Sequence, residues 1–158
     1  MKKTFLIIVY SLFSQFSVAQ EGTKHFDFII SIDGNIMQTL TNPQIVIKND
    51  KDILKTINVS YHPGNLSINQ EVISMLPERE KTIYLKFDYS EYSTKKGEQE
   101  IHNYEIEMGK NWFDKSYMIV KIYNTYKKQN KKLLPLDGKT YTFDLDYSGG
   151  QMIRVRKK

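Results

Sequence analysis

Four lysines and two tyrosines, close together in the chain, have the residue types and spacing of a surface that binds an anion. Aromatic rings interleaved with cations suit stacking on sugars, and the ammonium groups suit phosphate or carboxylate groups. We therefore expect a binding site at this segment, and a solvated loop that resists aggregation is the alternative. The candidate residues are Tyr123, Tyr126, Lys127, Lys128, Lys131 and Lys132.

The three histidines of the chain are spaced poorly for a metal centre. His25, His62 and His102 fall on separate expected strands or strand ends. None of them has the i, i+2 or i, i+4 neighbour that would place two ligands on one face. We expect no metal site and no cofactor. A concave pocket that joins His62 or His102 to two carboxylates would instead favour an enzyme.

Paired carboxylates offer a second possible chemistry, at Asp144 and Asp146. Residues two apart on a strand point to the same side, and paired acids could bind calcium or act in glycoside hydrolysis. The two acids alternate with apolar residues, however, so we interpret them as the solvent face of an amphipathic strand. The turns around Asp33 and Asp50 lack the acid spacing of an EF-hand, although calcium at such a turn stays an alternative.

Sequence motifs of nucleophilic and nucleotide-dependent enzymes are missing from the chain. It contains no Gly-x-Ser-x-Gly elbow, no His-Glu-x-x-His pair and no phosphate-binding glycine loop. The absence of cysteine excludes disulfides, thiol catalysis and cysteine-ligated metals. We therefore expect a protein that is not an enzyme, although a triad assembled from distant residues would leave no local motif.

The first 19 residues have the three-part layout of a secretory signal peptide. A basic start and an apolar run are followed by Ser17-Val18-Ala19, whose small residues suit signal peptidase. The alternative is a membrane anchor, but that needs about 20 apolar residues, and polar residues interrupt this run. We expect cleavage after Ala19, which leaves residues 20–158 as one exported domain, periplasmic or secreted.

The charge of the mature chain is small. The chain has 23 basic and 18 acidic residues, and since the leader holds two lysines and no acid, 21 basic residues and a net charge of +3 would remain. This excess does not by itself indicate nucleic acid, and we expect no nucleic-acid partner for an exported protein. No second apolar run reaches membrane-spanning length, so we expect no stable membrane insertion after cleavage.

Period-two alternation of apolar and polar residues dominates the remaining chain and predicts seven to nine short strands. The pattern favours an all-β fold, a two-sheet antiparallel β-sandwich with an immunoglobulin-like or prealbumin-like outline. A small barrel is the alternative. Residues 70–76 could form one short helix. Residues 112–126 are apolar on both faces, which is typical of a central strand.

Two hairpins allow predictions of register. Matching the apolar faces of residues 82–92 and 101–108 places Phe87 opposite Tyr104 and Lys86 opposite Glu105. In the last hairpin, residues 148–150 predict a three-residue turn that places Asp144 opposite Arg154 on a solvent-exposed face.

These features together predict a non-catalytic binding module of the bacterial cell envelope or secretome, active as a monomer. Its partner would be an envelope or secreted protein, or an anionic glycan, held by loops on a rigid scaffold. The alternatives are a periplasmic inhibitor or immunity-type protein that blocks another protein, and a small hydrolase with dispersed Asp and His residues. A flat patch of tyrosine and lysine would favour binding.

Overall fold

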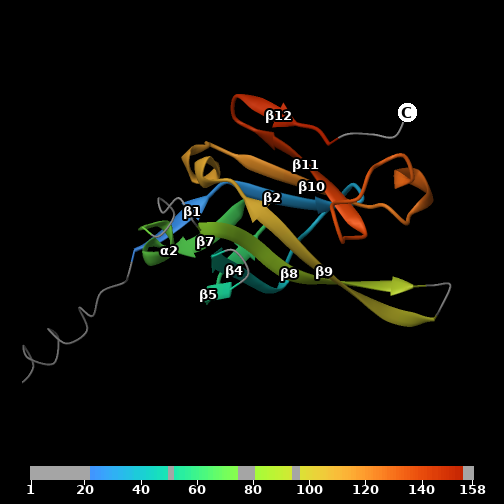
Figure 1. The fold of residues 1–158 in the computed structure, drawn as a ribbon, viewed down its shortest axis with the longest axis horizontal. Coiled ribbons are helices and arrows are strands. Elements are labelled where there is room, and N and C mark those ends of the chain that lie inside the picture. The colour runs from blue at the N-terminus through green and yellow to red at the C-terminus, as the bar shows by residue number, and fades with distance from the viewer. Residues whose placement is uncertain (1–21, 50–51, 75–80, 94–96, 155–158) are drawn as a thin grey trace, which may run out of the picture.

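The computed structural model describes residues 22–49, 52–74, 81–93 and 97–154, and strands dominate these ranges (Figure 1). The expected signal peptide, residues 1–19, lies outside the described residues. The strands are β1 Thr23–Phe26, β2 Phe28–Ile32, β3 Asn35–Ile36, β4 Thr41–Asn49, β5 Asp52–Asn58, β6 Ser60–His62, β7 Asn65–Asn69, β8 Lys81–Ser93, β9 Glu98–Met108, β10 Met118–Asn124, β11 Tyr141–Tyr147 and β12 Gly150–Met152. The helical elements are α2 Gln70–Ser74 and the 3-10 helices η1 Lys110–Asp114 and η2 Lys128–Asn130.

The strands form sheets that pack around a common hydrophobic core, which confirms the expected all-β, sandwich-like fold. They are divided among three sheets where two were expected, with the orders β1-β7-β6, β12-β11-β10-β2-β3 and β5-β4-β8-β9. The pairing of β2 with β10 is parallel, whereas the other pairings are antiparallel. Parallel strands need a long crossover connection, and the segment between β2 and β10 includes the strands β3 to β9. The immunoglobulin-like or prealbumin-like outline stays a prediction.

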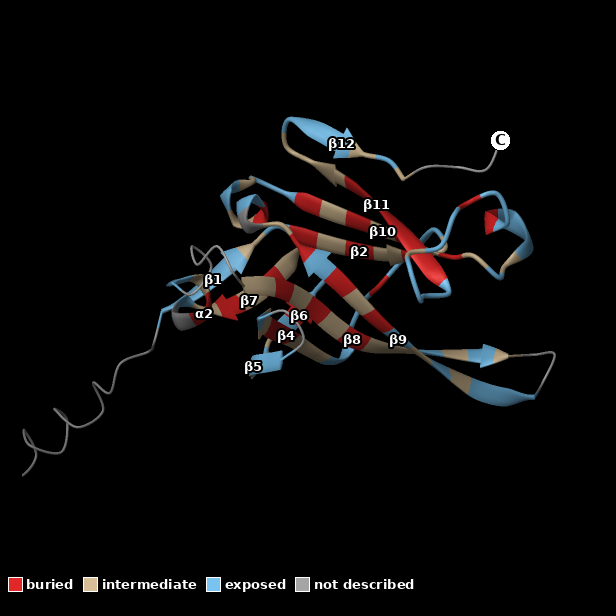
Figure 2. Ribbon diagram, viewed as in Figure 1, coloured by how far each residue is buried: buried red, intermediate tan, exposed pale blue. Residues whose placement is uncertain are grey.

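Alternation along the strands builds the core, because successive side chains point to opposite faces of a sheet. Figure 2 shows this as buried bands that alternate with less buried ones along β2, β8 and β10. Fully buried apolar side chains come from all three sheets and form one cluster. They include Ile30, Val120 and Ile122, then Ile45, Leu85 and Ile106, and also Leu66 and Ile68.

The predicted register of β8 and β9 is confirmed. Phe87 lies opposite Tyr104, and Lys86 lies opposite Glu105. The Glu105 carboxylate, however, bonds to Lys48 and Lys139 rather than to its cross-strand neighbour. The hairpin extends beyond the body of the molecule as an arm, residues 89–93 and 98–102 (Figure 1); residues 94–96 of its expected tip lie outside the described residues.

Two other expectations about local structure meet different outcomes. The short helix expected near residues 70–76 is confirmed as α2, Gln70–Ser74, and residues 75–76 lie outside the described residues. The expected central strand is confirmed as β10, which lies between β2 and β11. Its predicted start at Trp112 was wrong, because that residue lies in η1, where a 3-10 turn buries the indole against the core.

The prediction for the last hairpin was wrong in its turn and in its exposure. Tyr147 pairs with Gly150, so only Ser148 and Gly149 form the turn, and the register differs by one residue from the predicted one. Gly149, the second residue of this turn, has a positive φ of 94°, which glycine adopts readily. Asp144 is buried, and its carboxylate accepts a hydrogen bond of 2.9 Å from the Arg154 backbone N–H. The strand is therefore covered on both faces, which alternation alone could not reveal.

Tyrosine hydroxyls satisfy backbone groups at two places where sheets meet. The Tyr141 hydroxyl accepts a hydrogen bond from the Glu105 N–H at 2.8 Å and donates one to the Glu105 carbonyl at 2.9 Å. The Tyr61 hydroxyl accepts a hydrogen bond from the Ile30 N–H and donates one to the Met37 carbonyl. Since β9 is an edge strand, Tyr141 takes the place of a neighbouring strand and covers part of this edge. Among the described residues, no helix is long and apolar enough to cross a membrane.

Replacing Tyr141 by phenylalanine tests this role of the hydroxyl. We expect Tyr141→Phe to lower the free energy of unfolding by about 1–3 kcal/mol, because two backbone groups of Glu105 lose their partner. Urea unfolding measures the loss, and amide exchange at Glu105 should become faster. Tyr117→Phe is the control, because its exposed hydroxyl makes only a long contact of 3.4 Å with Asp146. Equal stability of the two variants would contradict the role.

Candidate binding site

The expected lysine segment forms a loop of residues 125–139 between β10 and β11, called here the lysine loop (Figure 1). Short backbone hydrogen bonds shape it. The Asn130 N–H donates to the Lys127 carbonyl and the Leu133 N–H donates to the Asn130 carbonyl, each at 2.9 Å. The side chains of Asn130 and Leu133 are buried. The loop is therefore anchored to the body of the protein as well as exposed to solvent.

The main anchor is the carboxylate of Asp33, in the turn between β2 and β3. Its side chain is only 4% exposed. It accepts hydrogen bonds from the Asn124 N–H at 2.9 Å, the Asn124 amide group at 2.8 Å and the Asn130 amide group at 2.7 Å. Asp33 itself adopts a left-handed backbone with φ of 51°, which Asp tolerates better than most residues. One carboxylate thus joins the end of β10 to η2.

The two asparagines extend this network in both directions. The Asn130 amide also donates to the Asn124 carbonyl at 3.1 Å. The Asn124 side-chain oxygen accepts a hydrogen bond of 2.9 Å from the buried Tyr104 hydroxyl on β9. Burial raises the pKa of Tyr104 further above its ordinary value, so this hydroxyl keeps its proton even in alkaline solution. Sequence reasoning missed both asparagines; a polar residue at a core position of an apolar strand, as at Asn124, was the available signal.

Lys127 belongs to the anchor rather than to the exposed surface. Its ammonium lies 3.0 Å from Asp33 and 2.8 Å from Glu91 on the β8–β9 arm. Burial would lower the pKa of Lys127, but the hydrogen bonds to Glu91 and Asp33 outweigh burial and raise that pKa above its ordinary value. Its charge is therefore compensated inside the protein, unlike that of a lysine that awaits a ligand.

Tyr126 stacks against His102, which lies between two tyrosine rings. The ring centroids of Tyr126 and His102 are 6.0 Å apart and those of Tyr89 and His102 are 6.4 Å apart, with nearly parallel planes. Glu91 and Glu100 each approach the His102 ring nitrogen to 3.9 Å. Tyr126 is nevertheless 49% exposed. It is thus held in place on one side and accessible on another.

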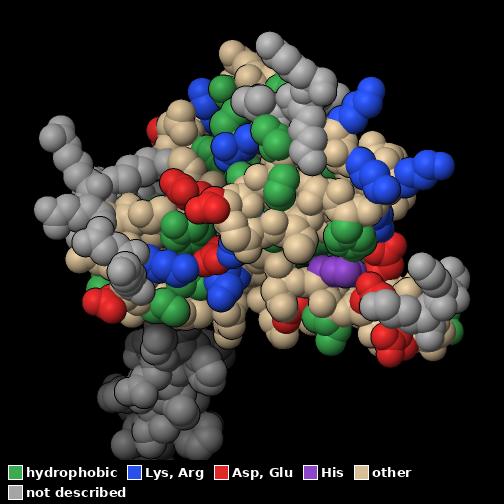
Figure 3. Space-filling model, turned by 45° about the vertical axis from the view of Figure 1, so that its right-hand side comes forward, with side chains coloured by type: hydrophobic (Ala, Val, Ile, Leu, Met, Phe, Trp, Pro, Cys, Tyr) green, Lys and Arg blue, Asp and Glu red, His purple; other side chains and the backbone are tan. Residues whose placement is uncertain are grey.

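The other lysines of the loop are directed to solvent. Lys128, Lys131 and Lys132 are exposed, and within the described part of the chain none of them forms an ion pair. Figure 3 shows lysine or arginine side chains that extend from this part of the molecule, near acidic side chains and a histidine. Tyr123 lies within β10, half-buried on the face opposite the core residues of that strand. Three of the four predicted lysines, Lys128, Lys131 and Lys132, are thus exposed, as is Tyr126, whereas Lys127 is half-buried.

A second anchor holds the far end of the loop. The Lys139 ammonium bonds to Glu105 at 3.0 Å, and Lys48 on β4 bonds to the same carboxylate at 2.5 Å. Burial alone would raise the pKa of Glu105, but the hydrogen bonds from Lys48 and Lys139 outweigh burial and hold that pKa below its ordinary value. Both ends of the loop are therefore fixed by carboxylates.

His25 and His62 lie in the sheet β1-β7-β6, whereas His102 lies on β9. His25 is exposed and bonds to the Ser67 hydroxyl at 2.8 Å, and His62 is exposed at the end of β6. In the described ranges no group of three or more His, Cys, Asp or Glu side chains is placed to hold a metal ion. His102, with its two carboxylates, is the histidine closest to the pattern expected of a hydrolase.

Comparison of the chain with protein-family models, with curated proteins and with solved structures finds no match. No family therefore assigns a role to any residue of the lysine loop. The chemistry of the loop follows from its own anchors, its exposed cations and the tyrosine beside them.

Asp33 should contribute more to stability than the lysine that pairs with it. We expect Asp33→Ala to lower the free energy of unfolding by about 3–5 kcal/mol, because the Lys127 ammonium and the donors on Asn124 and Asn130 lose a buried acceptor. Lys127→Met should cost less, since Asp33 keeps its other donors. Urea unfolding of both variants measures the difference. A greater loss for Lys127→Met would contradict this ranking.

Glu105 should make stability depend on pH in the acidic range. Because its pKa is lower in the folded protein, its ion pairs stabilise the fold above its ordinary pKa of 4.5, and this contribution disappears as pH falls through the folded pKa. At neutral pH we expect the free energy of unfolding of wild type to exceed that of Glu105→Gln by less than about 1 kcal/mol, because Lys139 is well exposed and solvent screens its ion pair. The difference should vanish in strong acid. A constant difference across this range would contradict the assignment.

Proposed function

We propose that this chain is an exported, non-catalytic binding module that holds an anionic glycan at the exposed part of the lysine loop. The contacts would come from Lys128, Lys131 and Lys132, with Tyr126 beside them as a stacking surface. One observation carries the proposal: the loop pairs the half-buried Lys127 and the buried Asn130 with Asp33, while three neighbouring lysines remain exposed. Export and a periplasmic or secreted location rest on the leader sequence alone.

Pre-organisation supports this use of the loop. A loop that must be ordered on binding loses part of its interaction energy to that ordering. Here Asp33 and Glu105 anchor both ends, so the backbone that carries the exposed lysines is fixed beforehand. Clustered cations also attract an anionic partner over a distance and increase its rate of association. Such contacts would be sensitive to salt.

An inhibitor or immunity-type protein is the second candidate, and the β8–β9 arm favours it. Tyr92 and Ile101 on this arm are 65% and 69% exposed. Large apolar side chains on a projecting hairpin are suited to insertion into a partner protein. The arm is linked to the lysine loop through the Glu91–Lys127 ion pair, so one partner could contact both elements.

The hydrolase alternative finds less support. His102 has two carboxylates nearby, as that alternative requires, but Tyr89 and Tyr126 stack on its ring. A hydrolase would also need this histidine at the wall of a cavity. The cavities beside Asp88 and beside Trp112 are lined by other residues.

Removing the exposed cations tests the proposed function. We expect the triple variant Lys128→Ala, Lys131→Ala, Lys132→Ala to bind sulfated and carboxylated oligosaccharides at least about tenfold more weakly, a loss of about 1.4 kcal/mol. Binding is measured on a glycan array and by titration at two salt concentrations. The matched control is Lys24→Ala, Lys81→Ala, Lys115→Ala, which makes the same charge change away from the loop.

The outcomes separate the candidates. Weaker binding by the loop variant alone supports the glycan proposal, whereas equal losses in both variants indicate a general charge effect and contradict it. A third outcome would replace the glycan proposal with the inhibitor candidate. In that case wild type binds no glycan but captures a protein from the native envelope, and the double variant Tyr92→Ser, Ile101→Ser does not capture it.

A further inference from the structure

A second polar site lies on the outer face of the β8–β9 hairpin, opposite the face where His102 and Glu91 meet the Tyr126–Lys127 end of the lysine loop. His102 points toward the loop, and Asn103, the next residue, points to the outer face of the sheet β5-β4-β8-β9. There a cavity of about 280 Å³ is open to solvent. We name it the bulge pocket; its polar lining side chains are Asn42, Gln44, Lys86, Asp88 and Asn103.

A β-bulge in β4 builds this pocket. Thr41 pairs with Asp88 and Gln44 pairs with Lys86, so Asn42 and Pro43 together oppose Phe87. Proline has no N–H for the ladder and is tolerated at such an irregularity. Asn42 adopts a left-handed backbone with φ of 50°, a conformation that Asn tolerates better than most residues. Bulges often redirect a side chain at a functional site, and this one turns Asn42 onto Asp88.

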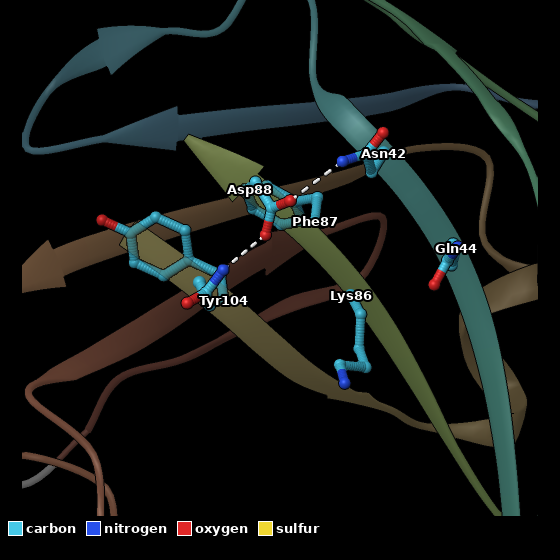
Figure 4. A pocket seen from close by; sticks show the side chains of 7 residues that line it. Asn42, Gln44, Lys86, Phe87, Asp88 and Tyr104 are labelled. Carbon is cyan, nitrogen blue, oxygen red and sulfur yellow. Dashed lines mark hydrogen bonds between the residues drawn. The ribbon is translucent and has the colours of Figure 1, made fainter. Parts of the chain in front are cut away.

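The Asp88 carboxylate organises the polar groups of the pocket. It accepts a hydrogen bond from the Asn42 amide at 3.1 Å and another from the Asn103 amide at 2.5 Å (Figure 4). Gln44 donates to Asn58 at 3.2 Å, which leaves its side-chain oxygen as an acceptor. Figure 4 shows Gln44 and Lys86 on neighbouring strands beside this group, while the Tyr104 ring points away from them.

The geometry points to a neutral sugar unit with adjacent hydroxyl groups as the ligand of the bulge pocket. A hydroxyl both donates and accepts, and the pocket presents a carboxylate acceptor next to amides that do both. The charges of Asp88 and Lys86 offset each other, so the pocket suits a neutral ligand. The volume lies just below the range of about 300–1,000 Å³ for ligand pockets, which suits one ring rather than a larger molecule.

Nuclear magnetic resonance of the full mature chain tests this site directly. The probes are the neutral trisaccharides maltotriose, cellotriose, mannotriose and chitotriose, each added separately. We expect at least one of them to shift the side-chain amide signals of Asn42 and Asn103. If none of the four shifts these signals, the inference is overturned.

Two variants separate the side chains from the backbone that holds them. Asn42→Gly keeps a residue that tolerates positive φ but removes the amide, and Asn103→Ala removes the second amide. Each should weaken binding of the active trisaccharide by about three- to tenfold, the effect of one lost hydrogen bond. Gln99→Ala is the matched control, because Gln99 lies on the same strand and face but outside the pocket.

Further controls distinguish this site from the lysine loop and from a cation site. Unchanged trisaccharide binding by the triple lysine variant supports an independent site, whatever that variant does to anionic glycans. Loss of binding in the triple lysine variant would overturn the assignment. So would binding that requires calcium and disappears with a chelator, or equal binding by wild type and both pocket variants with their thermal unfolding unchanged.

Discussion

The buried carboxylate of Asp33 is the interaction on which the arrangement of the lysine loop depends. It lies in the turn after β2, yet its partners lie on β10 and in η2 and belong to a segment far along the chain. A buried carboxylate with several donors resists rearrangement, because every alternative leaves a charge or a polar group without a partner. The parallel pairing of β2 with β10 places the end of β10 beside this turn.

This network divides a run of similar lysines into two groups with different roles. Lys127 joins Asp33 to Glu91 and thereby links the loop to the β8–β9 arm. Its neighbours Lys128, Lys131 and Lys132 remain exposed. Lys127 holds the loop in place, and the three exposed lysines give the surface its positive charge. The proposed glycan contact depends on both, since a fixed backbone lets the exposed cations bind without prior ordering.

The two faces of the β8–β9 hairpin carry different chemistry for a simple geometric reason. Alternate residues of a strand point to opposite sides, so His102 stacks with tyrosines on one side while Asn103 bonds to Asp88 on the other. The bulge at Asn42 adds a group from β4 to the second face. An anionic ligand is thus proposed for the lysine loop, and a neutral one for the outer face of this hairpin.

The sequence alone determined the all-β architecture, the short helix after β7 and the pairing of Lys86 with Glu105, because alternation specifies which residues share a face. It also located the cluster of lysines. Only the tertiary structure decided that Asp144 is buried, that acidic side chains compensate the charge of Lys127, and that Asn42 donates a hydrogen bond to Asp88. These features depend on contacts between distant segments and on a local bulge, neither of which leaves a periodic pattern in the chain.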